Sequence, residues 1–128
     1  MGVMSTRLHF IVPRDLILNA NQRMHWAPKS KRTAALRLMG RTEARDKRLG
    51  ATRAVLGINL GYPDKRQRDA ENYAPTVKAL VDGAVTDSGL LPADHDLHIV
   101  ARNWTSDVAG IKGCFVIDLT FEPVREDA

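Results

Sequence analysis

Residues 62–96 read YPDKRQRDAENYAPTVKALVDGAVTDSGLLPADHD, and a change of charge divides this stretch near its start. Three cations, Lys65, Arg66 and Arg68, come directly before a series of carboxylates. The carboxylates are Asp69, Glu71, Asp82, Asp87, Asp94 and Asp96. Basic side chains attract phosphate, and clustered carboxylate oxygens hold hard divalent cations. Hydrolysis of a phosphodiester needs both phosphate attraction and a divalent cation, so the segment where the charge changes sign is the candidate functional site of the chain.

The whole chain shows the same division of charge. Residues 1–68 contain 15 Lys and Arg but 4 Asp and Glu, whereas residues 69–128 contain 4 and 11. The net charge of +4 and the sequence pI of about 9.6 agree with a polyanionic partner. A solvated surface with uneven charge is the alternative interpretation.

The length and composition predict a single domain over residues 1–128, because 44% hydrophobic residues are enough for one core of this size. The single cysteine, Cys114, excludes an intrachain disulfide framework and fits a reducing compartment. No apolar run approaches the length of a membrane span, and the N-terminus lacks an apolar signal core. We therefore expect a cytoplasmic protein with no membrane partner.

Strand periodicity recurs along the chain. Leu8, Phe10 and Val12 alternate with more polar residues and share one face of a predicted strand. The predicted strands cover residues 6–13, 51–62, 97–104 and 113–122. We expect the last two to form a terminal hairpin.

Two helices are predicted between these strands. The first runs from Ser30 to Gly50 and carries a basic face, after an irregular loop over residues 14–28. The second follows Asp69, accepts Pro75 in its first turn and buries an apolar stripe. The order β-α-β-α-β-β predicts an α+β domain in which a small mixed sheet of about four strands packs against two main helices.

The acidic residues suggest how a phosphodiester would be cut. Asp69 and Glu71 stand two apart, so in an extended segment both point to the same side, and Asp94 could close the site from across the fold. Lys78 could sit against the scissile phosphate. Structural alternatives stay open: an anion-favouring helix start for Asp69 and Glu71, and a surface pair for Lys78 with Asp82.

Three segments together resemble the RusA-type Holliday junction resolvases, which are small endonucleases of phages and prophages. The first is the strand end and asparagine-bearing turn, VPRDLILNANQRMHW, which precedes a basic helix. The second is PDKRQRDAENYAPTVKALVDGAV, and the third is GLLPADHDLHIV. The resemblance covers most of the chain, and the motifs come in the order found in the family with nearly the same spacing.

The resemblance implies a homodimer that resolves four-way DNA junctions by paired symmetric nicks in DNA recombination and repair. It implies Mg²⁺, with Mn²⁺ as a possible substitute, held by Asp69, Glu71 and Asp94, and a catalytic role for these acids and Lys78. The bacterial or phage-infected cytoplasm is the implied location. The expected nucleic-acid-binding residues are Lys65, Arg66, Arg68, Lys29, Lys31, Arg32, Asn21 and Arg23.

The sequence departs from the family pattern at two positions. Glu71 stands where the family usually has aspartate, and Lys78 lies later than the usual spacing, across an inserted Ala-Pro-Thr. Another cation could therefore take the lysine role, and Asp96 is the alternative to Asp94. The alternative function is a junction-binding or duplex-binding protein without hydrolytic activity. A small RNA-binding module is disfavoured by the aromatic content of 5%.

Overall fold

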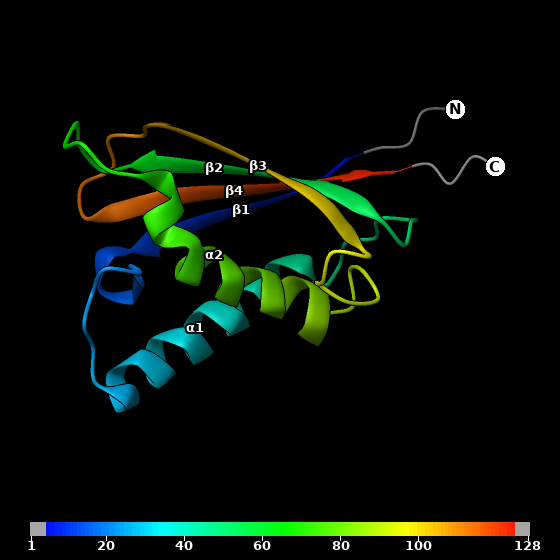
Figure 1. Ribbon diagram of the computed structural model, residues 1–128, viewed down its shortest axis with the longest axis horizontal. Coiled ribbons are helices and arrows are strands. Elements are labelled where there is room, and N and C mark those ends of the chain that lie inside the picture. The colour runs from blue at the N-terminus through cyan, green and yellow to red at the C-terminus, as the bar shows by residue number, and fades with distance from the viewer. Residues whose placement is uncertain (1–4, 125–128) are drawn as a thin grey trace.

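The alternating and helical segments fold into two layers over residues 5–124, the part of the chain that the computed structural model describes. A four-stranded mixed sheet forms one layer, and two helices cover one of its faces (Figure 1). The strands are β1 (Thr6–Pro13), β2 (Ala54–Tyr62), β3 (Ile99–Val108) and β4 (Cys114–Pro123). The main helices are α1 (Trp26–Ala44) and α2 (Ala74–Val81), with shorter helical segments η1 (Arg14–Leu16), η2 (Ala70–Tyr73) and η3 (Asp82–Asp87). The predicted α+β class is confirmed.

The predicted hairpin of the last two strands is wrong. The strand order across the sheet is β1-β4-β2-β3, so β4 lies between β1 and β2 and pairs antiparallel with both. Strand β3 instead pairs in parallel with β2 at the edge of the sheet. The connection between these two strands passes through α2, as parallel strands require because their facing ends cannot be joined by a tight turn.

Burial differs between the central strand β4 and the edge strand β3. On β4 the alternating side chains Phe115, Ile117, Leu119 and Phe121 are at most 5% exposed, and the other edge strand, β1, buries its inward side chains equally well. Strand β3 buries only Ile99 fully and exposes most of its other side chains. The apolar period identified the buried face of β4, but it did not identify the neighbouring strands.

Helix α1 differs from the predicted range of Ser30 to Gly50 at both ends. Pro28 lies in its first turn, where a backbone N–H has no partner within the helix, so the proline does not delay the start. The His25 carbonyl already accepts a hydrogen bond from the Lys29 amide at 3.2 Å. At the other end the helix stops before Gly50, which lies in the following loop.

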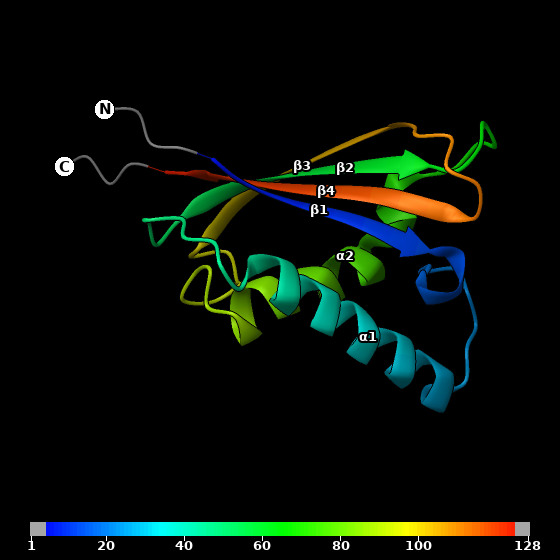
Figure 2. The ribbon, with the colours of Figure 1, turned by 180° about the vertical axis from the view of Figure 1, so that it is seen from behind.

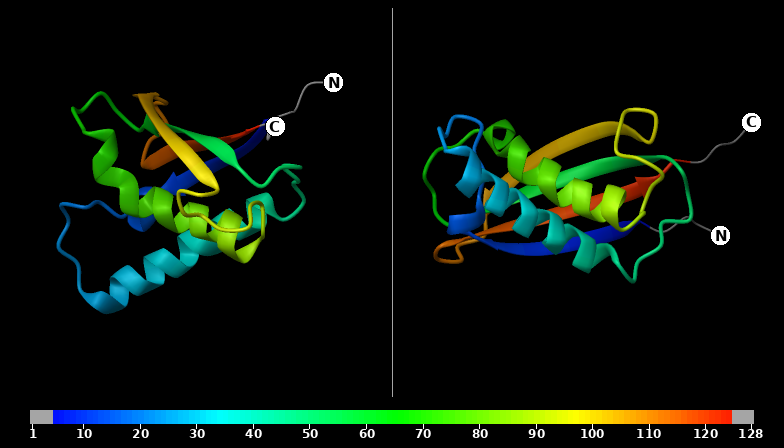
Figure 3. Two further views of the ribbon diagram at one scale, coloured as in Figure 1. Left: turned by 45° about the vertical axis from the view of Figure 1, so that its right-hand side comes forward. Right: turned by 90° about the horizontal axis from the view of Figure 1, so that it is seen from below.

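Helix α1 and the α2–η3 segment cross closely because each contributes a glycine to the contact. A Cβ atom on Gly40 would lie 2.1 Å from the Leu80 carbonyl oxygen, and one on Gly83 would lie 1.9 Å from the Arg37 carbonyl oxygen. Any side chain at either position would force the backbones apart. Figure 3 shows the two helices side by side across the sheet. This contact fixes the position of the helix that carries Lys78.

The hydrophobic core lies between the sheet and the helices. It includes alternate residues of β1, β2 and β4 together with the inward face of α2. Figure 2 shows the same layers from behind, with β1 beside β4 and α1 beneath them. Across residues 5–124 no helix combines the length and the apolar character needed to cross a membrane.

Candidate functional site

The basic run after β2 folds back on itself. The Asp64 carboxylate accepts hydrogen bonds from the Arg66 amide at 2.9 Å and from the Arg68 guanidinium at 2.8 Å. The same guanidinium lies 5.1 Å from the ring centre of Tyr62 and 5.5 Å from that of Phe115, and the Arg68 side chain is only 5% exposed. A cation over an aromatic face is stabilised by the ring electrons. Arg68 is therefore committed to packing, whereas Arg66 is exposed.

Asp69 and Glu71 follow this run at the start of η2. Asp69 has an extended backbone and Glu71 lies in the 3-10 turn, so the two acids do not share one extended segment. Both side chains are exposed, and within residues 5–124 neither takes part in an ion pair or a side-chain hydrogen bond. Their carboxylate oxygens are available to an external cation.

The loop before α1 is tied to η2 and α2. The Ala20 amide donates a hydrogen bond to the Asn72 carbonyl at 2.7 Å. Thr76 is fully buried, and its hydroxyl accepts from the Leu18 amide and donates to the Leu18 carbonyl, each at 2.7 Å. The Ala-Pro-Thr segment at residues 74–76 thus provides the threonine that holds this loop. The turn that carries Asn21 is held beside η2 as a result.

Most of the predicted nucleic-acid-binding residues face solvent. Arg32 is an exception, because it is half-buried and donates to the Ile17 carbonyl at 2.9 Å. This bond gives Arg32 a structural role at the base of the loop. The exposed residues are Lys65, Arg66, Asn21, Arg23, Lys29 and Lys31.

Lys78, Asp82 and Asp94 form what we call the acidic cluster. The Lys78 ammonium lies 3.0 Å from the Asp82 carboxylate and also pairs with Asp94, which comes from the loop between η3 and β3. The side chains of both acids are about one-fifth exposed, and that of Lys78 is 63% exposed. The predicted Lys78–Asp82 pair is therefore present, but a third residue joins it. The spacing of Lys78 and Asp82 indicated their pair, whereas the approach of Asp94 to Lys78 was implied only by the family resemblance.

The pKa values in the acidic cluster move in opposite directions. The hydrogen bond with Asp82 and then that with Lys78 lower the pKa of Asp94 to about 2. Burial and then the contact with Asp94 raise the pKa of Asp82. A proton shared between the two carboxyls therefore resides on Asp82, and Asp94 is the ionised member of the pair.

Arg102 of β3 distinguishes Asp94 from Asp96. Its guanidinium donates to the Asp94 backbone carbonyl at 3.1 Å and lies 3.3 Å from the Asp96 carboxylate. Asp96 is 96% exposed and pairs with Arg102, whereas the Lys78 ammonium pairs with Asp94. Of the two candidates for the distal acid, Asp94 is the one that meets Lys78.

A small cavity of about 170 Å³ adjoins the acidic cluster between α2 and the sheet. Lys78 and Asp94 lie at its border, and Ala74 and the half-buried Trp104 line it with other apolar side chains. Trp104 packs against the core.

The structure does not gather the predicted metal ligands into one group. Over residues 5–124 no set of three or more His, Cys, Asp or Glu side chains lies close enough together to hold a metal ion. Asp69 and Glu71 occupy one end of the η2–α2 segment, and Asp94 is engaged by Lys78. The magnesium site therefore stays a prediction.

Comparisons with known proteins add no family assignment. A scan against protein-family models finds no match to this chain, and a search of curated proteins finds none either. The function has to be argued from the side chains described above.

Proposed function

We propose that this chain is a metal-dependent endonuclease that cuts four-way DNA junctions, in the manner of the RusA-type resolvases that its motifs resemble. One observation carries the proposal. Asp69 and Glu71 are exposed carboxylates without partners within residues 5–124, and they directly follow the exposed cations Lys65 and Arg66. Cations that attract phosphate and carboxylates that can bind a metal ion are thus close together in the chain.

The donor atoms suit a hard divalent cation, because every predicted ligand is a carboxylate oxygen. Asp69 and Glu71 would hold Mg²⁺ or Mn²⁺, and Asp94, which pairs with Lys78 in this structure, is the third ligand that the resemblance implies. When bound, the cation would supply an activated water and neutralise the leaving oxygen. The hydrogen bonds with Asp82 and Lys78 favour the ionised form of Asp94, and the Lys78 ammonium, which is 63% exposed, would neutralise charge on a bound phosphate.

The proposal includes a homodimer in the cytoplasm of a bacterium or of a phage-infected cell, acting in DNA recombination and repair. A four-way junction has approximate twofold symmetry, and two symmetric nicks require two sites related by such an axis. Sedimentation of the protein with and without a junction measures this assembly state.

A nicking assay on a synthetic four-way junction tests the activity. We expect paired nicks with Mg²⁺ or Mn²⁺ and none with EDTA. Asp69→Asn should bind the junction as tightly as the parent in EDTA but should not cut it. Asp46→Asn is the matched control, because Asp46 is also exposed and unpaired within the described residues but lies in the turn after α1. Equal cutting by both variants would remove Asp69 from the site.

A junction-binding protein without hydrolytic activity is the second candidate. The observation in its favour is that two carboxylates already neutralise Lys78, which gives this lysine a structural use. Tight junction binding with no nicks at any tested concentration of Mg²⁺ or Mn²⁺ would support this candidate.

A further inference from the structure

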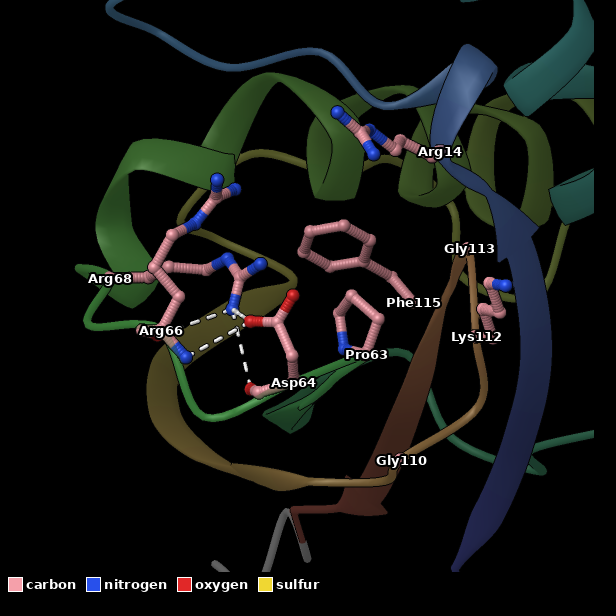
Figure 4. Close-up of a pocket in the computed structure, with 9 residues that line it drawn as sticks. All are labelled: Arg14, Pro63, Asp64, Arg66, Arg68, Gly110, Lys112, Gly113 and Phe115. Atoms are coloured by element: carbon pink, nitrogen blue, oxygen red, sulfur yellow. Dashed lines mark hydrogen bonds and ion pairs between the residues drawn. The ribbon is translucent and has the colours of Figure 1, made fainter.

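A pocket of about 340 Å³ lies at one end of the sheet, apart from the acidic cluster. Three segments distant in sequence surround it. They are the start of η1 with Arg14, the loop after β2 with Arg66 and Arg68, and the connection from β3 to β4 with Lys112. Phe115 of β4 also lines the space. Figure 4 shows the charged ends of Arg14, Arg66 and Lys112 on different sides of the Phe115 ring.

Three of the four cations that line this basic pocket have no ion-pair partner among the described residues. Within residues 5–124, the side chains of Arg14, Arg66 and Lys112 make no ion pair and no side-chain hydrogen bond. One carboxylate, Asp64, lines the pocket, and Arg68 already engages it at 2.8 Å. Three like charges around one cavity repel each other, and a bound anion would offset this repulsion. The pocket therefore carries an excess of positive charge that the described residues do not neutralise.

Backbone hydrogen bonds join the segments that carry these cations. The Arg14 amide donates to the Gly113 carbonyl at 2.9 Å, which ties η1 to the connection from β3 to β4. Gly110 and Gly113 adopt left-handed φ values of 73° and 72°, which let this connection turn towards the pocket. The Gly110 amide donates to the Tyr62 carbonyl at 3.1 Å. The geometry is therefore set by bonds between segments and not by a ligand.

A buried donor also marks the pocket. Arg68 lines it, its side chain is 5% exposed, and its Nε atom has no hydrogen-bond partner among the described residues. A buried N–H without an acceptor is costly, because it has lost its water and gained nothing in exchange. An anion oxygen is the kind of acceptor that such a donor lacks.

We infer that the basic pocket binds the phosphoryl group of a nucleotide, with Arg14, Arg66 and Lys112 as its ligands. Arginine and lysine are suited to phosphate oxygens, and the volume admits a nucleotide rather than an isolated ion. In the proposed nuclease the phosphoryl group would belong to the DNA strand that leads to Asp69, and this assignment to DNA rests on the proposed function. The phosphate site itself does not.

The direct test is a titration of the protein with thymidine 5′-monophosphate, inorganic phosphate and thymidine, followed by amide chemical shifts at constant ionic strength. We expect both phosphate compounds to shift the amides of residues 14, 66 and 110–113, and thymidine to shift none. Arg14→Gln with Lys112→Gln should weaken nucleotide binding about tenfold or more, since charged hydrogen bonds are lost. Arg66→Gln alone should weaken it less.

A second pair of cations gives the matched control. Arg7→Gln with Lys47→Gln removes the same charge, but Arg7 lies 3.1 Å from Asp118 and Lys47 lies 3.4 Å from Glu43. These cations are already neutralised, so the control should bind the nucleotide as the parent does. Equal weakening in both double variants would overturn the inference, because a general loss of charge would then explain it. Shifts that thymidine also produces would overturn it too.

A junction-binding measurement in EDTA connects the pocket to DNA. The slope of log affinity against log salt should flatten by about two units in Arg14→Gln with Lys112→Gln, one for each lost phosphate contact. Nucleotide binding without junction binding would leave the pocket standing and overturn the proposed nuclease. Normal junction cutting with no nucleotide binding and an unchanged salt slope would overturn the phosphate site and leave the proposed nuclease standing.

Discussion

The acidic cluster and the basic pocket treat their charges in opposite ways. In the acidic cluster the single cation, Lys78, is neutralised by Asp82 and Asp94 from its own chain. In the basic pocket the one lining carboxylate, Asp64, is engaged by Arg68, and Arg14, Arg66 and Lys112 have no ion-pair partner within residues 5–124. The cation of the acidic cluster is neutralised within the chain, whereas the unpaired cations of the basic pocket would be neutralised only by an anion from outside.

This difference teaches where a ligand is to be expected. Charges that pair within the chain act on position and on pKa, as the pKa of about 2 at Asp94 illustrates. Charges that stay unpaired around a preformed cavity contribute to binding. In the chain, Asp69 and Glu71 lie between Arg66 of the pocket and Lys78 of the acidic cluster, and their exposed carboxylates are unpaired within the described residues.

Asp94→Asn should produce the largest effect on cutting. If the acidic cluster supplies a ligand, junction cleavage falls on the order of 10³-fold, because a charge aimed at the reacting phosphate or its cation is lost. Asp96→Asn removes the same charge from a 96% exposed side chain and should cut at nearly the parent rate. Single-turnover cleavage of a synthetic junction measures both. Equal rates for the two variants would assign no catalytic part to Asp94.

Gly83→Ala should affect the acidic cluster and not the basic pocket, because it destabilises the helical segment beneath the acidic cluster. The new Cβ would lie 1.9 Å from the Arg37 carbonyl oxygen, so we expect the free energy of unfolding to fall by about 3 kcal/mol. Gly57→Ala is the control, because its Cβ would make an ordinary contact at 3.8 Å with Thr120. Urea unfolding measures both. A fall below about 1 kcal/mol for Gly83→Ala would contradict the close crossing.

Thr76→Val tests the bonds that hold the asparagine-bearing loop against α2. Valine has nearly the same shape but leaves the Leu18 amide and carbonyl without partners, so unfolding should become easier by about 2 kcal/mol. Thr76→Ser keeps the hydroxyl and should lose much less. Chemical denaturation compares the two variants. If serine proves as harmful as valine, the methyl group and not the hydroxyl stabilises this contact.

The pH dependence of stability gives the smallest effect. The pKa of Asp94 falls from 3.8 to about 2 on folding, so the stabilisation that it contributes is present above 3.8 and is lost as the pH falls towards 2. The melting temperatures of the parent and of Asp94→Asn should therefore differ at pH 6 and converge near pH 2. Asp82 has a raised pKa and acts in the opposite direction, so Asp82→Asn should not show this convergence. A constant gap between the parent and Asp94→Asn would contradict the assignment.

Local patterns predicted the elements well and their neighbours poorly. The strand over residues 6–13 and the apolar face of β4 follow from side-chain alternation, and α2 follows from its apolar stripe and Pro75. The prediction missed the helix start at Trp26 because it assigned Pro28 to the preceding loop, although proline is also common in the first turn of a helix. The terminal hairpin was wrong because strand pairing depends on which partner buries more surface.

The candidate site divides in the same way. Composition and spacing alone were enough to find the change of charge at Asp69 and the Lys78–Asp82 pair, because both are properties of residues close together in the chain. The approach of Asp94 to Lys78, and the meeting of Arg14 with Lys112 around Phe115, depend on loops that close over long stretches of chain. Such contacts follow from the burial of β4 between β1 and β2 and from the glycine crossing of the helices, and no local pattern contains either.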